Sequence, residues 1–362
     1  MAVSQSDLAQ MRLQNIQALR GLAALAVVLS HLVFVEAKYS TAPILSELFL
    51  FGMSGVDLFF VISGFIMVYI TQTRQSAQPN NILDFLFARA ARIYPLYWVV
   101  TLALLLVYLV RPDMVFASSS GEPNILKSFL LWPDERLPLL EVGWTLIHEM
   151  SFYLAFALLL FIPTKWRFAG AFFWGVAVYI GLRAGWHEQT NITRILFHPL
   201  TFEFLAGAFV AWIMIARPLK FGWVFSTIGA GGLIAAIYIW RNDMMALFDL
   251  PWHRVFTLLA PMSFILAAAL AFEHRQKIAP RPLVRLGDWS YSLYLTHVLS
   301  ISLAGRVWAL FERPGPIDNA VMLLLMIVFS IVVAGATYRF IEKPMLDAAK
   351  RASKKLAARK LP

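Results

Sequence analysis

The 362-residue sequence contains no cysteine, which excludes disulfides, thiolate nucleophiles and cysteine-ligated metals. Charged residues are scarce as well, at 14% of the chain, whereas soluble proteins carry about 25%. Hydrophobic residues make up 60%, including 29 Phe and 12 Trp, and the mean hydropathy is +0.68. A soluble fold has no interior large enough for so many apolar side chains, so a lipid bilayer is the expected solvent.

The charge balance is basic, with a formal net charge of +10 at pH 7. In a soluble protein this would favour a nucleic-acid partner, but here the basic residues flank apolar segments. Membrane orientation and anionic lipid headgroups explain them better, so we expect membrane lipids and no nucleic acid as partners. The first residues, MAVSQSDLAQMRLQNIQ, lack the basic region and cleavage site of a signal peptide, so we expect the first apolar segment to be retained.

Ten segments are apolar and long enough to cross a bilayer, for which about 17–25 residues are needed. They lie at 17–35, 48–71, 93–110, 143–162, 168–186, 199–216, 221–240, 254–272, 287–310 and 319–340. The sequence therefore predicts an all-α polytopic membrane protein, with a transmembrane domain over 1–346 and a basic tail over 347–362. An even number of spans places both termini on one side. The excess of Lys and Arg on that side predicts that both are cytoplasmic.

Ionisable residues inside a membrane span are costly and usually have a partner or a function. The notable ones in the predicted spans are His31, Asp57, Glu149, Glu203, Asp288 and His297. In ALRGLAALAVVLSHL, Arg20 and His31 are eleven residues apart, which is about 16 Å of helical rise and close to three full turns. The two side chains should therefore share one helix face. Taken singly, each also fits a structural interpretation, in which Arg20 reaches lipid headgroups and His31 makes an interhelical hydrogen bond.

A second group of charges lies on the third and fourth predicted spans. Arg89 and Arg92 share a face at the start of the third span, where two guanidinium groups suit the phosphates of a cytosolic ligand. Membrane anchoring is the alternative for this pair. In GWTLIHEMSFY, we expect Glu149 to lie at a depth similar to that of His31 and to orient its ring for general base catalysis. His148 points about 100° away from Glu149 on a helix, and an interfacial belt of Trp144, His148 and Glu149 is the alternative.

Other residues are candidates for a substrate path. They are Asp57, Ser63, Tyr94, Trp144, Tyr291 and His297. Ser63 and Gly64 mark a kink or a lining point near mid-membrane, and Tyr291 and His297 lie on one stripe that also suits interhelical hydrogen bonding. In YRFIEKP, we expect Arg339 and Glu342 to pair at i, i+3 where a helix ends before a proline.

Taken together, these motifs resemble the acyltransferase-3 family of integral membrane O-acyltransferases. The matching stretches are IQALRGLAALAVVLSH, GVDLFFVISGFIM, RAARIYPLYW, GWTLIHEMSFY, LGDWSYSLYLTHVL and YRFIEKP, in family order over about residues 14 to 345. GWTLIHEMSFY looks most like the bacterial exopolysaccharide O-acetyltransferase branch, in which a tyrosine commonly stands at the position of His148.

The resemblance implies a ten-helix domain in the bacterial inner membrane. It also implies an acyl-CoA donor, most simply acetyl-CoA, and a carbohydrate acceptor, often lipid-linked or exported. By motif position, the family's first-helix arginine and histidine fall on Arg20 and His31, its arginine pair on Arg89 and Arg92, and its fourth-helix glutamate on Glu149. No permanently bound cofactor and no metal are implied.

Two routes for the transfer follow, together with one competing function. CoA phosphates dock near the three arginines, and His31, oriented by Glu149, deprotonates a sugar hydroxyl that attacks the thioester. Alternatively, His31 first forms an acyl-enzyme intermediate. The competing class is a transporter or flippase for a glycan or an anion, because buried charges also suit a permeation path.

Overall fold

The computed structural model describes residues 13–73, 82–115, 121–217 and 219–359, with side chains described up to residue 352. The predicted tail over 347–362 lies partly outside these residues. Within the described part every regular element is a helix. The chain divides into two compact units, each described here by itself: the first comprises Met1–Arg74 with Phe202–Gly335, and the second Gln75–Thr201 with Ala336–Pro362.

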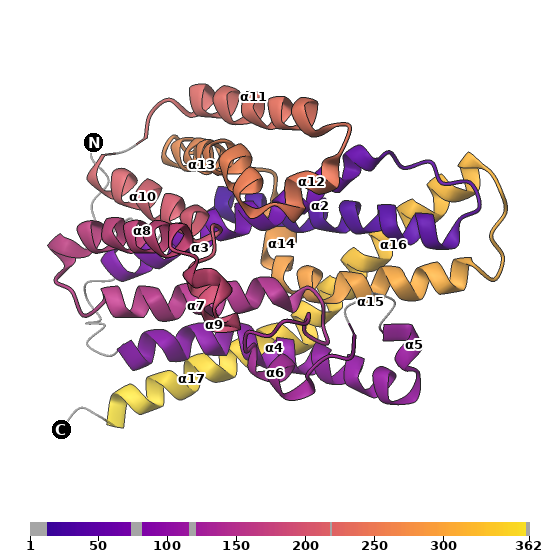
Figure 1. Cartoon of the computed structure of the whole chain (residues 1–362), viewed down its shortest axis with the longest axis horizontal. Helices are drawn as coiled ribbons and strands as arrows, with labels where there is room; N and C mark the ends of the chain where they lie inside the picture. Colours follow the sequence, from indigo (N-terminus) through magenta and orange to yellow (C-terminus); the bar gives the residue numbers. More distant parts are fainter. Residues whose placement is uncertain (1–12, 74–81, 116–120, 218, 360–362) are drawn as a thin grey trace. The chain divides into compact units, whose positions relative to one another are not determined.

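The first unit is built mainly from long apolar helices (Figure 1). Its elements are α2 (Gln14–Tyr39), η1 (Glu47–Ser54), α3 (Gly55–Thr73), α10 (Thr201–Ala216), α11 (Gly222–Trp240), α12 (Met244–Asp249), α13 (Pro251–His274), α14 (Arg281–Asp288), α15 (Ser290–Trp308) and α16 (Pro316–Thr337). Helix α2 contacts η1, α3, α13, α14 and α15, so it is the central helix of this unit.

The second unit holds the remaining helices. They are α4 (Ile82–Val110), α5 (Pro112–Val115), α6 (Ile125–Leu130), α7 (Gly143–Leu159), η2 (Thr164–Trp166), α8 (Arg167–Arg183), η3 (Trp186–Glu188), α9 (Asn191–Leu196), the π-helical turn η4 (Tyr338–Glu342) and α17 (Lys343–Arg359). Helix α4 contacts α7, η4 and α17.

All ten predicted spans are helical in the structure, and the all-α prediction is confirmed for the described residues. Among the residues that the structure describes, seven helical segments are long and apolar enough to cross a membrane: Gln14–Tyr39, Glu47–Gln72, Ile82–Val110, Asn191–Ala216, Gly222–Trp240, Pro251–His274 and Pro316–Ala352. Helices α7 and α8 are too short for this criterion, at 17 residues each. The count of ten and the cytoplasmic termini therefore stay predictions, whereas a multi-pass membrane protein is established.

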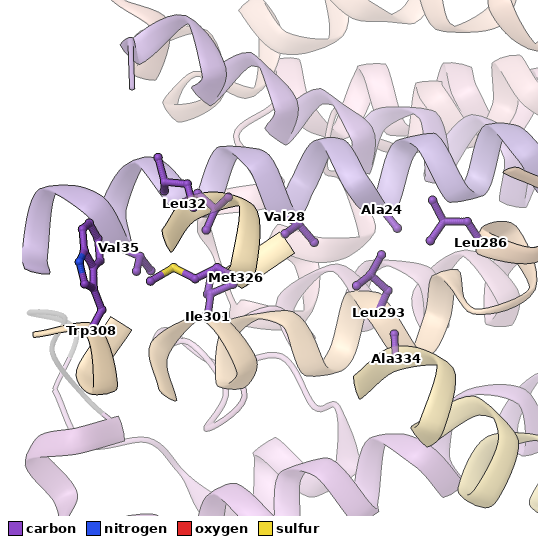
Figure 2. Packing of buried hydrophobic residues seen from close by; sticks show 11 residues of the cluster. Ala24, Val28, Leu32, Val35, Leu286, Leu293, Ile301, Trp308, Met326 and Ala334 are labelled. Atoms are coloured by element: carbon purple, nitrogen blue, oxygen red, sulfur yellow. The ribbon is translucent and has the colours of Figure 1, made fainter. Parts of the chain in front are cut away.

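The core of the first unit lies between α2, α15 and α16 (Figure 2). Small and branched side chains recur at three- and four-residue spacing along α2 and meet larger ones from its neighbours. The labelled members are Ala24, Val28, Leu32, Val35, Leu286, Leu293, Ile301, Trp308, Met326 and Ala334. This packing holds α2 and α15 side by side, which fixes the positions of the polar residues that they carry.

Helices α3 and α10 approach each other through two glycines. A Cβ atom on Gly64 would collide with the carbonyl oxygen of Phe204, and one on Gly207 with that of Val61. Glycine at such crossings lets two backbones come into direct contact, as in small-residue motifs of membrane helices. Gly64, predicted from the sequence as a kink or a lining point, therefore serves as a helix contact in this structure.

We expect Gly207→Val to destabilise the protein, because the collision is with backbone atoms that cannot move aside independently. Gly231→Ala is the matched control, since a Cβ there meets nothing within 4 Å. Thermal unfolding of detergent-purified variants, followed by size-exclusion fluorescence, measures the effect. A Gly207→Val variant that unfolds at the temperature of Gly231→Ala would contradict the close crossing.

Candidate active site

His31 lies on α2 with its ring held by its own helix. Its Nδ1 is 2.8 Å from the carbonyl oxygen of Val27, one turn earlier. A carbonyl oxygen only accepts hydrogen bonds, so Nδ1 carries the hydrogen and Nε2 is the basic nitrogen of the neutral ring. The side chain is half-buried. The structure therefore presents an imidazole with a defined tautomer, suited to act as a base or a nucleophile through Nε2.

A second histidine lies directly beside it. The ring centroids of His31 and His297 are 4.8 Å apart, with the planes nearly perpendicular. His297 on α15 is completely buried, and its Nδ1 is 2.7 Å from the carbonyl oxygen of Tyr294. Its Nε2 is buried and has no hydrogen-bond partner among the described residues. The sequence placed His297 on a substrate path without pairing it with His31, and the structure brings the two rings together.

Arg20 lies eleven residues before His31 on the same unbroken helix, so the predicted common face is preserved. The start of α2 is fixed from outside, because the carboxylate of Glu273 accepts hydrogen bonds from the backbone N–H groups of Gln14 and Asn15, at 2.9 and 2.6 Å. A carboxylate at this position satisfies exposed donors and complements the helix dipole. Glu273 thereby anchors the end of the helix that carries Arg20.

Asp57 forms a buried ion pair. Arg254 on α13 donates to both carboxylate oxygens, at 2.7 and 2.9 Å, and both side chains are almost inaccessible to solvent. Glu203 is also buried, and its carboxyl group lies close enough to both members of the pair to interact with them. Such bidentate geometry joins α3 to α13 within the first unit. Asp57, predicted as a substrate-path residue, is thus engaged in an interhelical contact that the sequence did not reveal.

In the second unit, the partner of Glu342 differs from the expectation. Arg92 on α4 donates to the Glu342 carboxylate at 2.7 Å, and Glu342 is buried. The predicted pairing of Arg339 with Glu342 is wrong, because the chain forms a π-helical turn there and α17 then continues through Pro344. A π-helical turn is wider than an α-helical turn, so residues i and i+3 are no longer placed as in a regular α-helix. Pro344 is tolerated because it lies in the first turn of α17.

Arg89 and Glu149 belong to one polar cluster of the second unit. The guanidinium of Arg89 lies over the rings of Phe85 and Tyr153, at 6.0 and 5.9 Å. The hydroxyl of Tyr153 donates to the Glu149 carboxylate, one turn earlier on α7. The charges of Arg89 and Glu149 are close enough to interact. The expected pairing of Glu149 with His31 joins residues of different units and stays a prediction.

Tyr94 has a clear structural contact. The hydroxyl groups of Tyr94 and Tyr97 and the indole N–H of Trp98 donate to the carbonyl oxygens of residues 130, 128 and 129, at 2.9, 2.7 and 2.9 Å. These oxygens lie at the C-terminal end of α6, where a helix leaves carbonyl groups without intrahelical partners. The three aromatic side chains of α4 thereby dock the segment that follows residue 120.

The same segment contains a local ion pair. Lys127 donates to Asp134 at 2.9 Å, and this hydrogen bond lowers the pKa of the Asp134 carboxyl below its usual value. Asn124 caps α6 by accepting from the backbone N–H of Lys127 at 3.0 Å. This segment therefore has defined structure from residue 121 onward, while residues 116–120 lie outside the described part.

His148 also has a histidine neighbour in the second unit. Its ring centroid is 4.5 Å from that of His198 and 5.7 Å from that of Trp144. His198 accepts a hydrogen bond from the backbone N–H of Leu200 at 3.2 Å, so its Nδ1 is the unprotonated nitrogen. The ring of His148 therefore lies in an aromatic group with Trp144 and His198. The interfacial belt of Trp144, His148 and Glu149 stays an alternative interpretation.

Three further candidates lie on α15, α3 and α14. Tyr291 is buried on α15, and Ser63 is half-buried on α3 beside Gly64. Asp288 is half-buried at the end of α14. Their roles on a substrate path stay predictions.

Comparison with known proteins gives a family and several relatives. The family model described as an acyltransferase domain (Acyl_transf_3) matches residues 13–339. The chain is 29% identical over 333 residues to the exopolysaccharide production protein ExoZ of Rhizobium meliloti (strain 1021), covering 86% of this chain and 95% of the relative. It is 25% identical over 382 residues to the acyltransferase MdmB of Streptomyces mycarofaciens, covering 92% of each.

A third relative is longer than this chain. Identity to the peptidoglycan O-acetyltransferase OatA of Listeria monocytogenes is 24% over 370 residues, which is 91% of this chain and 55% of the relative. No solved structure matches the chain significantly. The resemblance drawn from the sequence motifs is thus confirmed over nearly the whole chain.

A double-mutant cycle tests the buried ion pair. We expect Arg254→Met alone to cost about 3–5 kcal/mol of stability, because it leaves buried carboxylates without a cation. Asp57→Asn combined with Arg254→Met should recover part of that loss. Thermal unfolding of the two single variants and the double variant measures the coupling.

The exposed pair Arg111 and Asp113 provides the control cycle, with side chains 61% and 63% accessible. Its coupling should be much smaller, because water and salt screen an exposed pair. If the losses of stability in the Asp57→Asn and Arg254→Met single variants simply add up in the double variant, the interaction between Asp57 and Arg254 is contradicted.

Proposed function

Because the chain belongs to the acyltransferase family whose model spans residues 13–339, we propose that it transfers an acyl group from acyl-CoA to a polysaccharide hydroxyl. The acyl group is most simply acetyl, and the acceptor is an exported or cell-surface glycan or its lipid-linked precursor. The match to an exopolysaccharide production protein over 95% of that relative's length favours this acceptor class, as does the match to a peptidoglycan O-acetyltransferase. The proposed location is the bacterial inner membrane.

The defined tautomer of His31 is the observation that carries the proposal. Its Nδ1–H is held by the Val27 carbonyl, so the lone pair of Nε2 is the reactive one. Acyl transfer from a thioester to an alcohol needs either a base that removes the hydroxyl proton or a nucleophile that carries the acyl group. His31 is suited to both roles. A base within hydrogen-bond reach contributes about 10²–10⁴-fold to the rate.

Arg20, Arg89 and Arg92 are the proposed ligands of the CoA phosphates. Guanidinium groups bind phosphate oxygens bidentately, and all three side chains are partly accessible. Arg92 donates a hydrogen bond to Glu342. Because an arginine has five N–H donors, its other donors can bind a phosphate. Glu342 then orients Arg92, which is the arrangement expected of a preorganised ligand.

The proposed role of Glu149 is that of a second acid–base group. Its hydrogen bond from Tyr153 and its proximity to the charge of Arg89 hold it in the polar cluster of the second unit. A transporter or flippase, the competing function, finds no support in the three relatives described above. None of them is named as a transporter.

We expect His31→Ala to lower acyl transfer by at least about 10²-fold, because the reactive nitrogen is lost. Protein reconstituted in liposomes is given radiolabelled acetyl-CoA and de-O-acylated envelope polysaccharide from cells that lack the protein. Label in the polysaccharide is then counted. His253→Asn, an exposed histidine on α13, is the control. Wild-type protein that consumes no acyl-CoA and leaves the acceptor mass unchanged, or His31→Ala at wild-type rate, would contradict the proposed function.

The arginine assignment is tested by removing phosphates from the donor. We expect Arg92→Met/Glu342→Gln to raise the KM for acetyl-CoA by about tenfold or more, since a charged hydrogen bond contributes about 1.5–3 kcal/mol. The KM for S-acetylpantetheine, which has no phosphate, should stay unchanged. Replacing Glu342 as well avoids an unpaired buried carboxylate. Arg111→Met is the control, and an equal loss with both donors would show that Arg92 does not bind phosphate.

A further inference from the structure

The pair of histidines in the first unit raises a chemical question that the proposed function leaves open. Both rings have Nδ1 fixed by a backbone carbonyl, Val27 for His31 and Tyr294 for His297. In the neutral form of each ring, Nε2 therefore carries the lone pair. In His297 that nitrogen is buried and no described residue forms a hydrogen bond with it, although burying an unsatisfied polar atom costs stability. Such atoms in native structures call for an explanation, and a role in the reaction is one of the recognised explanations.

The two possible routes of acyl transfer differ in how many bases they need. In direct transfer, His31 takes the hydroxyl proton and passes it to the departing thiolate, so one base is sufficient. In the two-step route, the acyl group occupies Nε2 of His31 while Nδ1–H stays bound to Val27. The acylated ring then has no lone pair with which to accept a proton. A second base beside it is required to activate the acceptor hydroxyl.

We propose that His31 carries the acyl group covalently and that His297 is the general base of the second step. The proposal rests on the proposed acyltransferase function. The ring centroids of the two histidines are 4.8 Å apart, so an acceptor bound beside one ring also lies close to the other. Half-buried His31 gives access to substrates, whereas buried His297 is shielded from water.

Atoms and charges balance in both steps. In the first, Nε2 of His31 attacks the thioester carbonyl, the C–S bond breaks, and the CoA thiolate leaves an acyl-imidazolium on the protein. In the second, Nε2 of His297 takes the proton of the acceptor hydroxyl while its oxygen bonds to the acyl carbon and the C–N bond breaks. The positive charge thus moves from the ring of His31 to that of His297. The proton is then released and neutralises the thiolate.

His297 is surrounded by groups that hold it without competing for its Nε2. The carbonyl oxygens of Leu293 and Tyr294 both lie within 3.2 Å of Nδ1. The Tyr294 ring is 5.9 Å away, between centroids, and packs edge-on against Phe59 of α3. This enclosure keeps the ring orientation fixed, as a base in a reactive site requires.

Two conservative substitutions of His297 distinguish a role as general base from a purely structural role. His297→Asn keeps a donor at the position of Nδ1 and removes Nε2, whereas His297→Gln places an amide at the position of Nε2 that cannot take up a proton. Purified protein in nanodiscs is incubated with radiolabelled acetyl-CoA, and the label bound to protein is measured. De-O-acylated envelope polysaccharide is then added, and the loss of label from the protein is followed over time.

We expect both His297 variants to become labelled at the wild-type rate and to lose the label to acceptor about 10²-fold more slowly. His31→Ala should not be labelled, and His253→Asn should behave as wild type. Discharge at the wild-type rate in both variants overturns the proposal. Labelling that slows as much as discharge shows a structural role and overturns it too.

The proposal and the proposed function fail in different ways. If wild-type protein acylates the polysaccharide but never carries label, transfer is direct and the role of His297 as second base is overturned, while the function stands. If acetyl-CoA is not consumed at all, the proposed function itself fails.

Discussion

The hydrogen bond from Nδ1 of His31 to the carbonyl of Val27 is the interaction on which the account of the site depends. It turns a flexible side chain into a ring with one defined reactive nitrogen, and it exists because α2 is unbroken from Gln14 to Tyr39. Other contacts preserve that helix: Glu273 satisfies its first backbone donors, and its apolar stripe packs against α15. The fold therefore fixes both the position and the tautomer of the imidazole.

The helices were predictable from the sequence because they follow from local features, namely apolar segments and regular helix geometry. The predicted apolar segments lie in helical parts of the chain, and the spacing of Arg20 and His31 on one face follows from helix geometry alone. The identity of the family was also predictable, since its motifs lie in order along the chain.

The partners of buried charges were not predictable, because they depend on packing between helices distant in sequence. Asp57 pairs with Arg254, 197 residues away, and Arg92 with Glu342, 250 residues away. The local i, i+3 rule gave the wrong partner for Glu342, since a π-helical turn replaced the regular helix. Arg254 was missed because it stands at the edge of a predicted span, although two buried carboxylates, at Asp57 and Glu203, were a signal that a cation was needed.

The tautomer of His31 is the most direct test of this account. Nitrogen-15 NMR of histidine-labelled protein in nanodiscs, with the His31 signals assigned by comparison with His31→Gln, reports which ring nitrogen carries the hydrogen. The account predicts a hydrogen on Nδ1 and an unprotonated Nε2 in the resting protein at neutral pH. A hydrogen on Nε2 with an unprotonated Nδ1 would contradict it, because the reactive lone pair would then point into the helix backbone.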